Sequence, residues 1–180
     1  YSSHKGRSIP VMIENYVKNG DRHFAISSSG NAGLAAALHV GTLNAKKSND
    51  FIELEVYIGL NAAPHKVGRL KSLADEHIRV LVKERPLQAL TQAINEGVRS
   101  LRQSTDDVAL VGYKSLAEEL TASTPAAVFI GTSSGTTAQA LAQYFIDNKT
   151  GTQVHIVQTS SCHPMTLTFE PYDGPDEPSV

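Results

Sequence analysis

The sequence is poor in cysteine, in unbalanced charge and in long apolar segments, and each shortage excludes a class of protein. The only cysteine, Cys162, cannot form a disulfide within the chain, which favours a reducing cytoplasm. The 16 Lys and Arg residues nearly balance 18 Asp and Glu residues, whereas a nucleic-acid-binding protein needs a basic stripe. No apolar run is long enough to span a bilayer, and no signal-peptide pattern opens the sequence. We expect a soluble cytoplasmic protein that binds neither nucleic acid nor membrane.

Familiar metal and nucleophile patterns are also missing. The seven histidines show no paired spacing, so no metal site is predicted. Cys162 and His163 are adjacent, and adjacent side chains rarely orient toward each other, which favours a buried thiol over a nucleophile with its base. The only basic cluster, Lys66, Arg69 and Lys71, fits the solvated face of a helix.

Apolar runs alternate along the chain between strand-like and helix-like spacing. We expect strands at 23–27, 53–58, 78–82, 126–130 and 154–158, and helices at 9–18, 32–43, 65–76, 87–101, 113–120 and 137–147. Continuous apolar runs, rather than strict alternation, are typical of a parallel sheet with both faces covered. The predicted fold class is therefore α/β, a parallel-sheet three-layer αβα arrangement, in one or two small domains.

Three short segments can supply chemistry, and the first is residues 3–7, which carry Lys5. A lysine amine forms an imine with an aldehyde, and the amides at the start of the following helix favour an anion. Pro10 is expected in the first turn of that helix, where its missing N–H costs little. The alternative for Lys5 is a solvated surface charge.

The second segment is residues 28–31, here called the asparagine loop, between an expected strand and helix. The hydroxyls of Ser28 and Ser29, with the amides around Gly30, can bind a carboxylate, because unpaired amides and the helix dipole favour an anion. Asn31 can donate and accept, which suits a phenolic oxygen on a cofactor ring. The alternative is a helix N-cap, where Ser, Asn and Gly are common.

The third segment is residues 131–136, here called the hydroxyl loop. Glycines allow a phosphate to approach the backbone amides, and the remaining side chains are hydroxyls. The residues that would hold a phosphate are Thr132, Ser133, Ser134, Gly135 and Thr136. No lysine follows the glycine as in a Walker loop, and the dinucleotide fingerprint is absent, so the loop favours a phosphate over a nucleotide. The alternative is a tight turn with a Ser or Thr cap.

In this order, the three segments resemble the pyridoxal-phosphate enzymes of the tryptophan-synthase beta family, fold type II. Residues 3–7 resemble the family's Ser-x-Lys-Asp-Arg segment, residues 28–31 match its Ser/Thr-x-Gly-Asn loop, and residues 132–136 fall where it places its phosphate loop. Residues 112–117 are similar to the Gly-x-Lys-Thr-Ile-Ala segment of threonine synthases. Gly6 departs from the family, which usually has Asp there.

The resemblance implies roles for these residues and pyridoxal 5'-phosphate as cofactor. Lys5 would form the Schiff base and move the α-proton, Asn31 would contact the ring 3-hydroxyl, and residues 28–30 would hold the carboxylate of an amino-acid substrate. Residues 132–136 would hold the cofactor phosphate. The implied activity is that of threonine synthase, with a serine/threonine dehydratase or a cysteine synthase-like enzyme as alternatives. A non-catalytic cofactor-binding homologue is the alternative of another class.

The resemblance also implies an organisation of the chain. Residues 1–20 and 102–170 would belong to a larger cofactor domain, 21–101 would form a smaller domain, and 171–180 would be a flexible tail. The family's opening strands and its partner for the pyridine nitrogen have no counterpart here, so we expect a chain truncated at both ends. A homodimer is implied as well.

Overall fold

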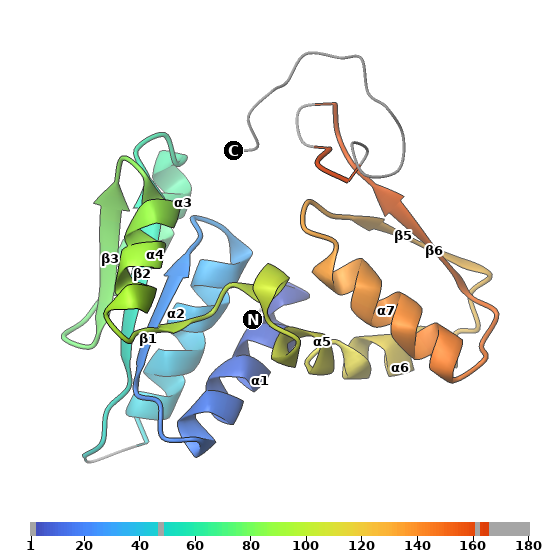
Figure 1. Cartoon of the computed structure of the whole chain (residues 1–180), viewed down its shortest axis with the longest axis horizontal. Helices are drawn as coiled ribbons and strands as arrows, with labels where there is room; N and C mark the ends of the chain where they lie inside the picture. Colours follow the sequence, from blue (N-terminus) through green and yellow to red (C-terminus); the bar gives the residue numbers. More distant parts are fainter. Residues whose placement is uncertain (1–2, 47–48, 161–162, 166–180) are drawn as a thin grey trace. The chain divides into compact units, whose positions relative to one another are not determined.

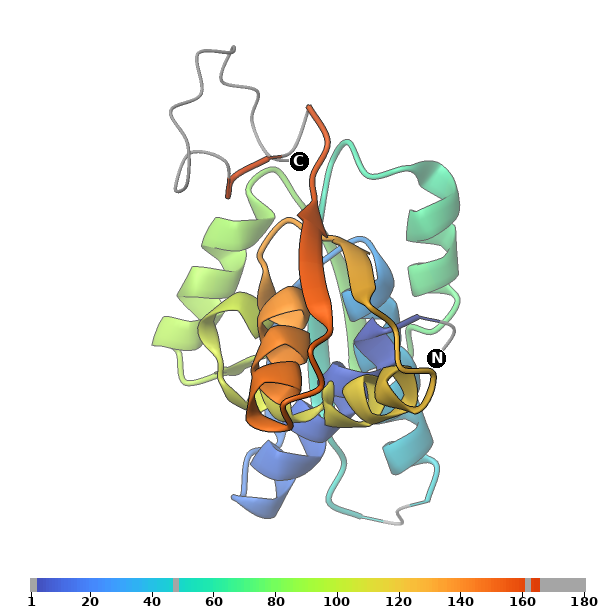
Figure 2. The same cartoon turned by 90° about the vertical axis from the view of Figure 1, so that its right-hand side faces the viewer.

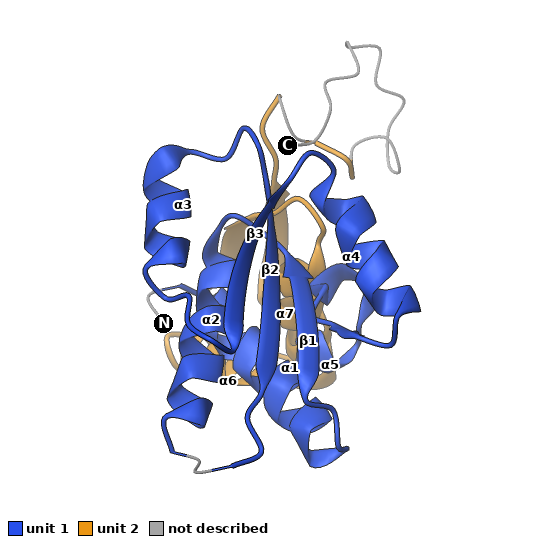
Figure 3. Ribbon diagram, turned by 90° about the vertical axis from the view of Figure 1, so that its left-hand side faces the viewer, with its two compact units in different colours: residues 1–112 blue, residues 113–180 orange. Residues whose placement is uncertain are grey.

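The computed structural model describes residues 3–46, 49–160 and 163–165. The chain separates into two compact units, residues 1–112 and 113–180, which are described one at a time (Figures 1 and 3). The tail expected at 171–180 lies outside the described residues, and so does Cys162.

Unit 1 contains a sheet of four parallel strands in the order β3-β2-β1-β4. The strands are β1 (His23–Ser27), β2 (Glu53–Gly59), β3 (Ile78–Lys83) and β4 (Arg99–Ser100). The helices are α1 (Lys5–Lys18), α2 (Asn31–Asn44), α3 (Pro64–Lys71), α4 (Pro86–Asn95) and α5 (Val108–Val111), with a 3₁₀ turn at Gln103–Thr105.

Helices cover both faces of this sheet, which makes unit 1 a three-layer structure (Figure 3). Phe24 and Ile26 face one side and join a core with helices α1, α2 and α3. Ala25, between them in the chain, faces the other side and packs with Leu90 and Ala93 of α4. Successive strand residues point to opposite faces, so a strand covered on both sides carries apolar residues in succession at its centre. The predicted α/β class with a parallel sheet is confirmed.

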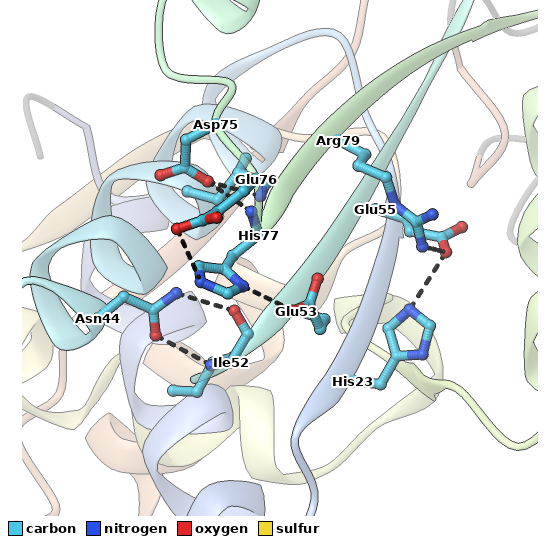
Figure 4. Close-up of polar contacts among 10 residues, drawn as sticks. His23, Asn44, Ile52, Glu53, Glu55, Asp75, Glu76, His77 and Arg79 are labelled. Carbon is cyan, nitrogen blue, oxygen red and sulfur yellow. Dashed lines mark hydrogen bonds and ion pairs between the residues drawn. The ribbon is translucent and has the colours of Figure 1, made fainter. Parts of the chain in front are cut away.

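Hydrogen bonds and ion pairs of polar side chains link the elements of unit 1 (Figure 4). The buried Asn44 side chain, at the end of α2, exchanges two hydrogen bonds of 2.9 Å with the Ile52 backbone. Across the strands, Arg79 Nη2 donates to Glu55 Oε1 at 2.5 Å, and His23 Nε2 lies 3.1 Å from the same oxygen. Burial raises the pKa of Glu55, but the Tyr57 hydroxyl and the Arg79 charge outweigh it, so the pKa is lowered overall.

Unit 2 contains a parallel pair of strands joined by a helix. Its elements are α6 (Lys114–Ala122), β5 (Ala127–Gly131), α7 (Thr136–Asp147) and β6 (Gln153–Val157). Figure 2 shows β5 and β6 side by side with α7 behind them. Ala117, Leu141 and Phe145 form the buried centre between the two helices and the strands.

All five expected strands are present within about one residue, but three expected helices were placed wrongly. Helix α1 begins at Lys5, four residues before the expected start, because turns from Ser3 and His4 lead directly into it. Pro10 therefore lies inside the helix and leaves the Gly6 carbonyl without its usual donor.

The helix expected at 87–101 ends at Asn95, because Gly97 adopts a φ of +91° and reverses the chain into strand β4. The helix expected at 65–76 ends at Lys71. Beyond it the Asp75 carboxylate accepts hydrogen bonds of 2.8 Å from the amides of His77 and Ile78, which favours a turn over a further helical turn.

Helix α1 packs against α2 and α5, all within residues 1–112. The expected grouping of residues 1–20 with 102–170 therefore differs from the compact unit in which α1 lies. As a statement about the domains of the whole protein, that grouping stays a prediction.

Candidate functional site

The asparagine loop lies at the carboxyl end of β1, at the point where the strand order reverses. Strand β1 is paired with β2 on one side and with β4 on the other. Helix α2 covers one face of the sheet on its way to β2, and α4 covers the other face on its way to β4. In parallel sheets ligands bind in the crevice that such a switch point leaves at the carboxyl edge. The loop therefore occupies the expected ligand position of this sheet.

The backbone of the loop is arranged around the start of α2. The Ser28 amide donates to the Tyr57 carbonyl at 3.1 Å, and the Ser28 hydroxyl accepts from the Gly30 amide at 3.2 Å. Asn31 is the first residue of α2 and is exposed. Gly30 occupies the N-cap position of α2, and no side chain of the described residues forms a capping hydrogen bond there. The first amides of α2 are left for an external acceptor.

Gly33 brings the first turn of α2 against the loop and the sheet. A Cβ at this position would lie 2.4 Å from the Ser28 carbonyl oxygen and 3.2 Å from Val56 Cγ1. Real Cβ atoms do not approach a backbone oxygen so closely, so only glycine fits.

Lys5 lies at the same edge of the sheet as the asparagine loop. Helix α1 leads into β1 through a short turn, and α2 leads into β2, so both helices run antiparallel to the strands and begin at the carboxyl edge (Figure 1). Lys5 is half-buried at the first position of α1. The hydroxyl oxygen of Ser3 is buried and has no hydrogen-bond partner among the described residues. A buried polar atom without a partner marks a place where a ligand can supply one.

Helix α5 holds the amino end of α1. A Cβ on Gly112 would lie 2.4 Å from Ser8 Cα and 2.7 Å from the Arg7 carbonyl oxygen. The buried Ser8 hydroxyl donates to the Ala109 carbonyl at 2.7 Å. The glycine that begins the segment 112–117 is thus explained by close contact with the helix that carries Lys5.

A pocket of about 340 Å³ opens beside the asparagine loop and is here called the α3 pocket. It is lined by Ser29, Gly30, Asn31 and Leu34 on one side, and by His65, Lys66, Arg69 and Leu70 of α3 on the other. Lys66 and Arg69 are exposed, as expected, but their place in one pocket with the loop was not predicted. The available signal was that α3 follows β2, the strand beside β1, so both loops meet at one edge.

The hydroxyl loop, in unit 2, has the same strand-to-helix context. Gly135 precedes α7 with a φ of +79°, and no side chain of the described residues caps that helix. The Gly135 amide donates to Thr132 Oγ1 at 2.9 Å, and the hydroxyls of Ser134 and Thr136 lie 3.2 Å apart. The loop adjoins a pocket of about 340 Å³ that includes Ile156. Hydroxyls and uncapped amides at the start of a helix fit a phosphate.

A larger cavity, of about 510 Å³, lies at the opposite, amino edge of the sheet of unit 1. Its charged side chains contact one another: the Tyr16 hydroxyl donates to Asp106, and the Arg99 guanidinium lies 4.6 Å from the Tyr16 ring centre. Burial and the bond to Asp106 raise the pKa of Tyr16 to about 12. Arg99 also pairs with the Asp21 carboxylate, and the cavity carries side chains of both signs, which leave no evident preference for a ligand.

The described part of the chain has no helix long and apolar enough to cross a membrane. Within the same residues, no group of three His, Cys, Asp or Glu side chains is placed to hold a metal ion.

The model of the family of pyridoxal-phosphate dependent enzymes matches residues 1–178. No curated protein matches the chain. Among solved structures, a pyridoxal 5'-phosphate-dependent aspartate racemase superposes with a TM-score of 0.77 and 18% identity, over 97% of this chain and 52% of its own.

Two further structures have the same fold. Threonine deaminase isoform 2 from Solanum lycopersicum has a TM-score of 0.74 and 20% identity, over 92% of this chain and 48% of its own. Diaminopropionate ammonia lyase from Escherichia coli has a TM-score of 0.74 and 15% identity, over 92% of this chain and 53% of its own. The chain thus spans about half the length of the structures that it matches.

Proposed function

Because the chain belongs to the family of pyridoxal-phosphate dependent enzymes, we propose that it carries most of the pocket of an enzyme that eliminates or replaces a group on an amino acid. Pyridoxal phosphate is the cofactor. The observation that carries the proposal is that Lys5 and the uncapped asparagine loop begin two helices at one edge of the sheet, at its switch point. An amine and an anion-binding loop at one edge are what an aldehyde cofactor and an amino acid require.

Lys5 is proposed as the catalytic residue. Its Nζ would hold the cofactor at its aldehyde carbon and would accept the proton from the α carbon of the substrate. When bound, the cofactor supplies a ring that delocalises the negative charge left on that carbon. The half-buried position of Lys5, beside the unpartnered Ser3 hydroxyl, supports this role.

The two loops are proposed to hold the anionic ends. Ser28, Ser29 and Gly30 bind the substrate carboxylate through hydroxyls and amides, and Asn31 binds the ring 3-hydroxyl. Residues 132–136 bind the cofactor phosphate. In support, neither α2 nor α7 is capped by a side chain of the described residues.

Within the family, we favour threonine synthase, which releases phosphate from phosphohomoserine and adds water to give threonine. The similarity of residues 112–117 to a threonine synthase segment supports this choice. A serine/threonine dehydratase or a cysteine synthase-like enzyme is the alternative, and a threonine deaminase is among the proteins of similar fold.

Turnover by the full-length protein, loaded with pyridoxal phosphate, separates these activities. We expect phosphate release from phosphohomoserine, and a loss of about a thousandfold in kcat for Lys5→Ala, the scale of a lost acid–base group. Lys18→Ala, an exposed lysine at the other end of α1, is the control and keeps full activity.

Other outcomes identify the alternatives. Keto acid formed from threonine or serine, without phosphate release, would make the protein a dehydratase. Cofactor binding without any turnover would make it a non-catalytic homologue, an outcome consistent with Gly6 in place of the family's Asp.

We also propose that the protein is a cytoplasmic homodimer. The single cysteine supports a reducing compartment, and the dimer rests on the family alone. Sedimentation equilibrium of the full-length protein tests the assembly, and a monomer at micromolar concentration would contradict it.

A further inference from the structure

The α3 pocket is the feature of unit 1 whose charge the proposed roles leave unused. Loop residues that are proposed to bind the substrate carboxylate form one wall, and residues of α3 form the other. Arg69 follows Lys66 by three positions and His65 by four, so it shares a face of the helix with each of them. A substrate whose carboxylate lies on the loop therefore extends its side chain toward α3.

The pocket is cationic without compensation. None of its lining residues is acidic. The side chains of Lys66 and Arg69 form no hydrogen bond or ion pair with the rest of the described chain, whereas Arg22, Arg79 and Arg99 are all paired with carboxylates. Two unpaired cations facing one small pocket repel each other, and a bound anion removes that repulsion.

The volume and the apolar lining of the pocket suit an amino acid with a short anionic side chain. Its volume, about 340 Å³, is at the lower end of the range for small-molecule sites. Leu34 and Leu70 are almost fully buried and supply an apolar surface for methylene groups between the α carbon and the charge.

We propose that Lys66 and Arg69 determine specificity by binding a second anionic group, at the end of the substrate side chain. This inference rests on the proposed function, because it takes the asparagine loop as the carboxylate site. The guanidinium of Arg69 can bind two oxygens of one phosphate or carboxylate, and the Lys66 ammonium adds a point charge. The substrate class is then an amino acid with a phosphate ester or a carboxylate on its side chain.

The test compares charged and uncharged ligands on variants of the full-length protein loaded with cofactor. O-phospho-L-homoserine is titrated against L-homoserine, and L-aspartate against L-asparagine, with the cofactor absorbance reporting binding. Lys66→Gln and Arg69→Gln should each lower the affinity ratio of charged to uncharged ligand about tenfold, the scale of one charge-assisted hydrogen bond. Lys71→Gln, an exposed lysine of α3 outside the pocket, should leave the ratio unchanged.

Which pair responds identifies the anion, since a phosphate site discriminates the first pair and a carboxylate site the second. Raising the salt concentration should reduce the discrimination of the wild type more than that of the variants. If both glutamine variants keep the wild-type ratios, while the cofactor still attaches to Lys5, this inference is wrong and the proposed function stands. If no cofactor attaches to Lys5, both are wrong.

Discussion

Gly33 is the residue on which the position of the asparagine loop depends most closely. The atom that excludes a side chain there is the Ser28 carbonyl oxygen, which belongs to the loop itself. Any residue larger than glycine must move either the loop or the first turn of α2. Residues that never touch a ligand can therefore control the site through the backbone.

We expect Gly33→Ala to lower the free energy of unfolding by about 1–3 kcal/mol, the range for overpacking in a close-packed site. It should also weaken cofactor binding, because the loop shifts. Gly68→Ala, in open space on α3, is the control and should gain about 0.5–1 kcal/mol in helix stability. Urea unfolding measures the stability of both variants, and equal stability of the two would contradict the account.

His77 makes the stability of unit 1 depend on pH. Its Nδ1 lies 2.7 Å from Glu53 Oε1 (Figure 4). Its ring stacks on that of Phe51. The hydrogen bond to Glu53 raises the pKa of His77 above 6.5. A raised pKa means that the pair stabilises the fold fully at a pH below 6.5, and that this contribution is lost as the pH rises through the higher, folded value.

Unfolding free energies at pH values of about 5.5 and 8.5 test this coupling. Relative to the wild type, His77→Gln should lose stability at the lower pH and little at the higher one. Glu53→Gln should show the same pattern, since it removes the partner. An equal loss at both pH values would mean that the charge on His77 contributes nothing.

At the scale of elements, the strands were predicted more accurately than the helix boundaries. Largely apolar runs such as 23–27 and 53–58 marked strands accurately, because a strand covered on both faces buries most of its residues. The end of α4 was missed because the amphipathic pattern continues to Leu101, past the Gly97 that ends the helix. The start of α1 was missed because Pro10 imitates a first-turn proline.

The turns before and after α7 offer a matched pair of glycines. Gly135 has a φ of +79° and Gly151 a φ of +74°, so alanine at either position is strained by about 1–2 kcal/mol. Only Gly135 lies in the hydroxyl loop, where a Cβ would come within 3.3 Å of Met165 Cε. We expect similar losses of stability from Gly135→Ala and Gly151→Ala, but weaker cofactor binding only from the first. Titration with pyridoxal phosphate measures this, and equal affinities would exclude the hydroxyl loop as the phosphate site.

At the scale of the whole molecule, the fold class could be predicted from the sequence but the arrangement of the site could not. The alternation of strands and helices indicated a parallel sheet, whereas the order β3-β2-β1-β4 depends on long-range pairing that no local pattern records. The same holds for the α3 pocket. Lys66 and Arg69 look like solvated charges along their helix, and only the adjacency of β1 and β2 brings them to the asparagine loop.

The central claim, that Lys5 is the residue that holds the cofactor, has a direct measurement. The full-length protein is loaded with pyridoxal phosphate, reduced with borohydride, digested and analysed by peptide mass. We predict the added mass on the peptide that contains Lys5, and none in the Lys5→Ala variant. Modification of another lysine, or of none, would contradict the account.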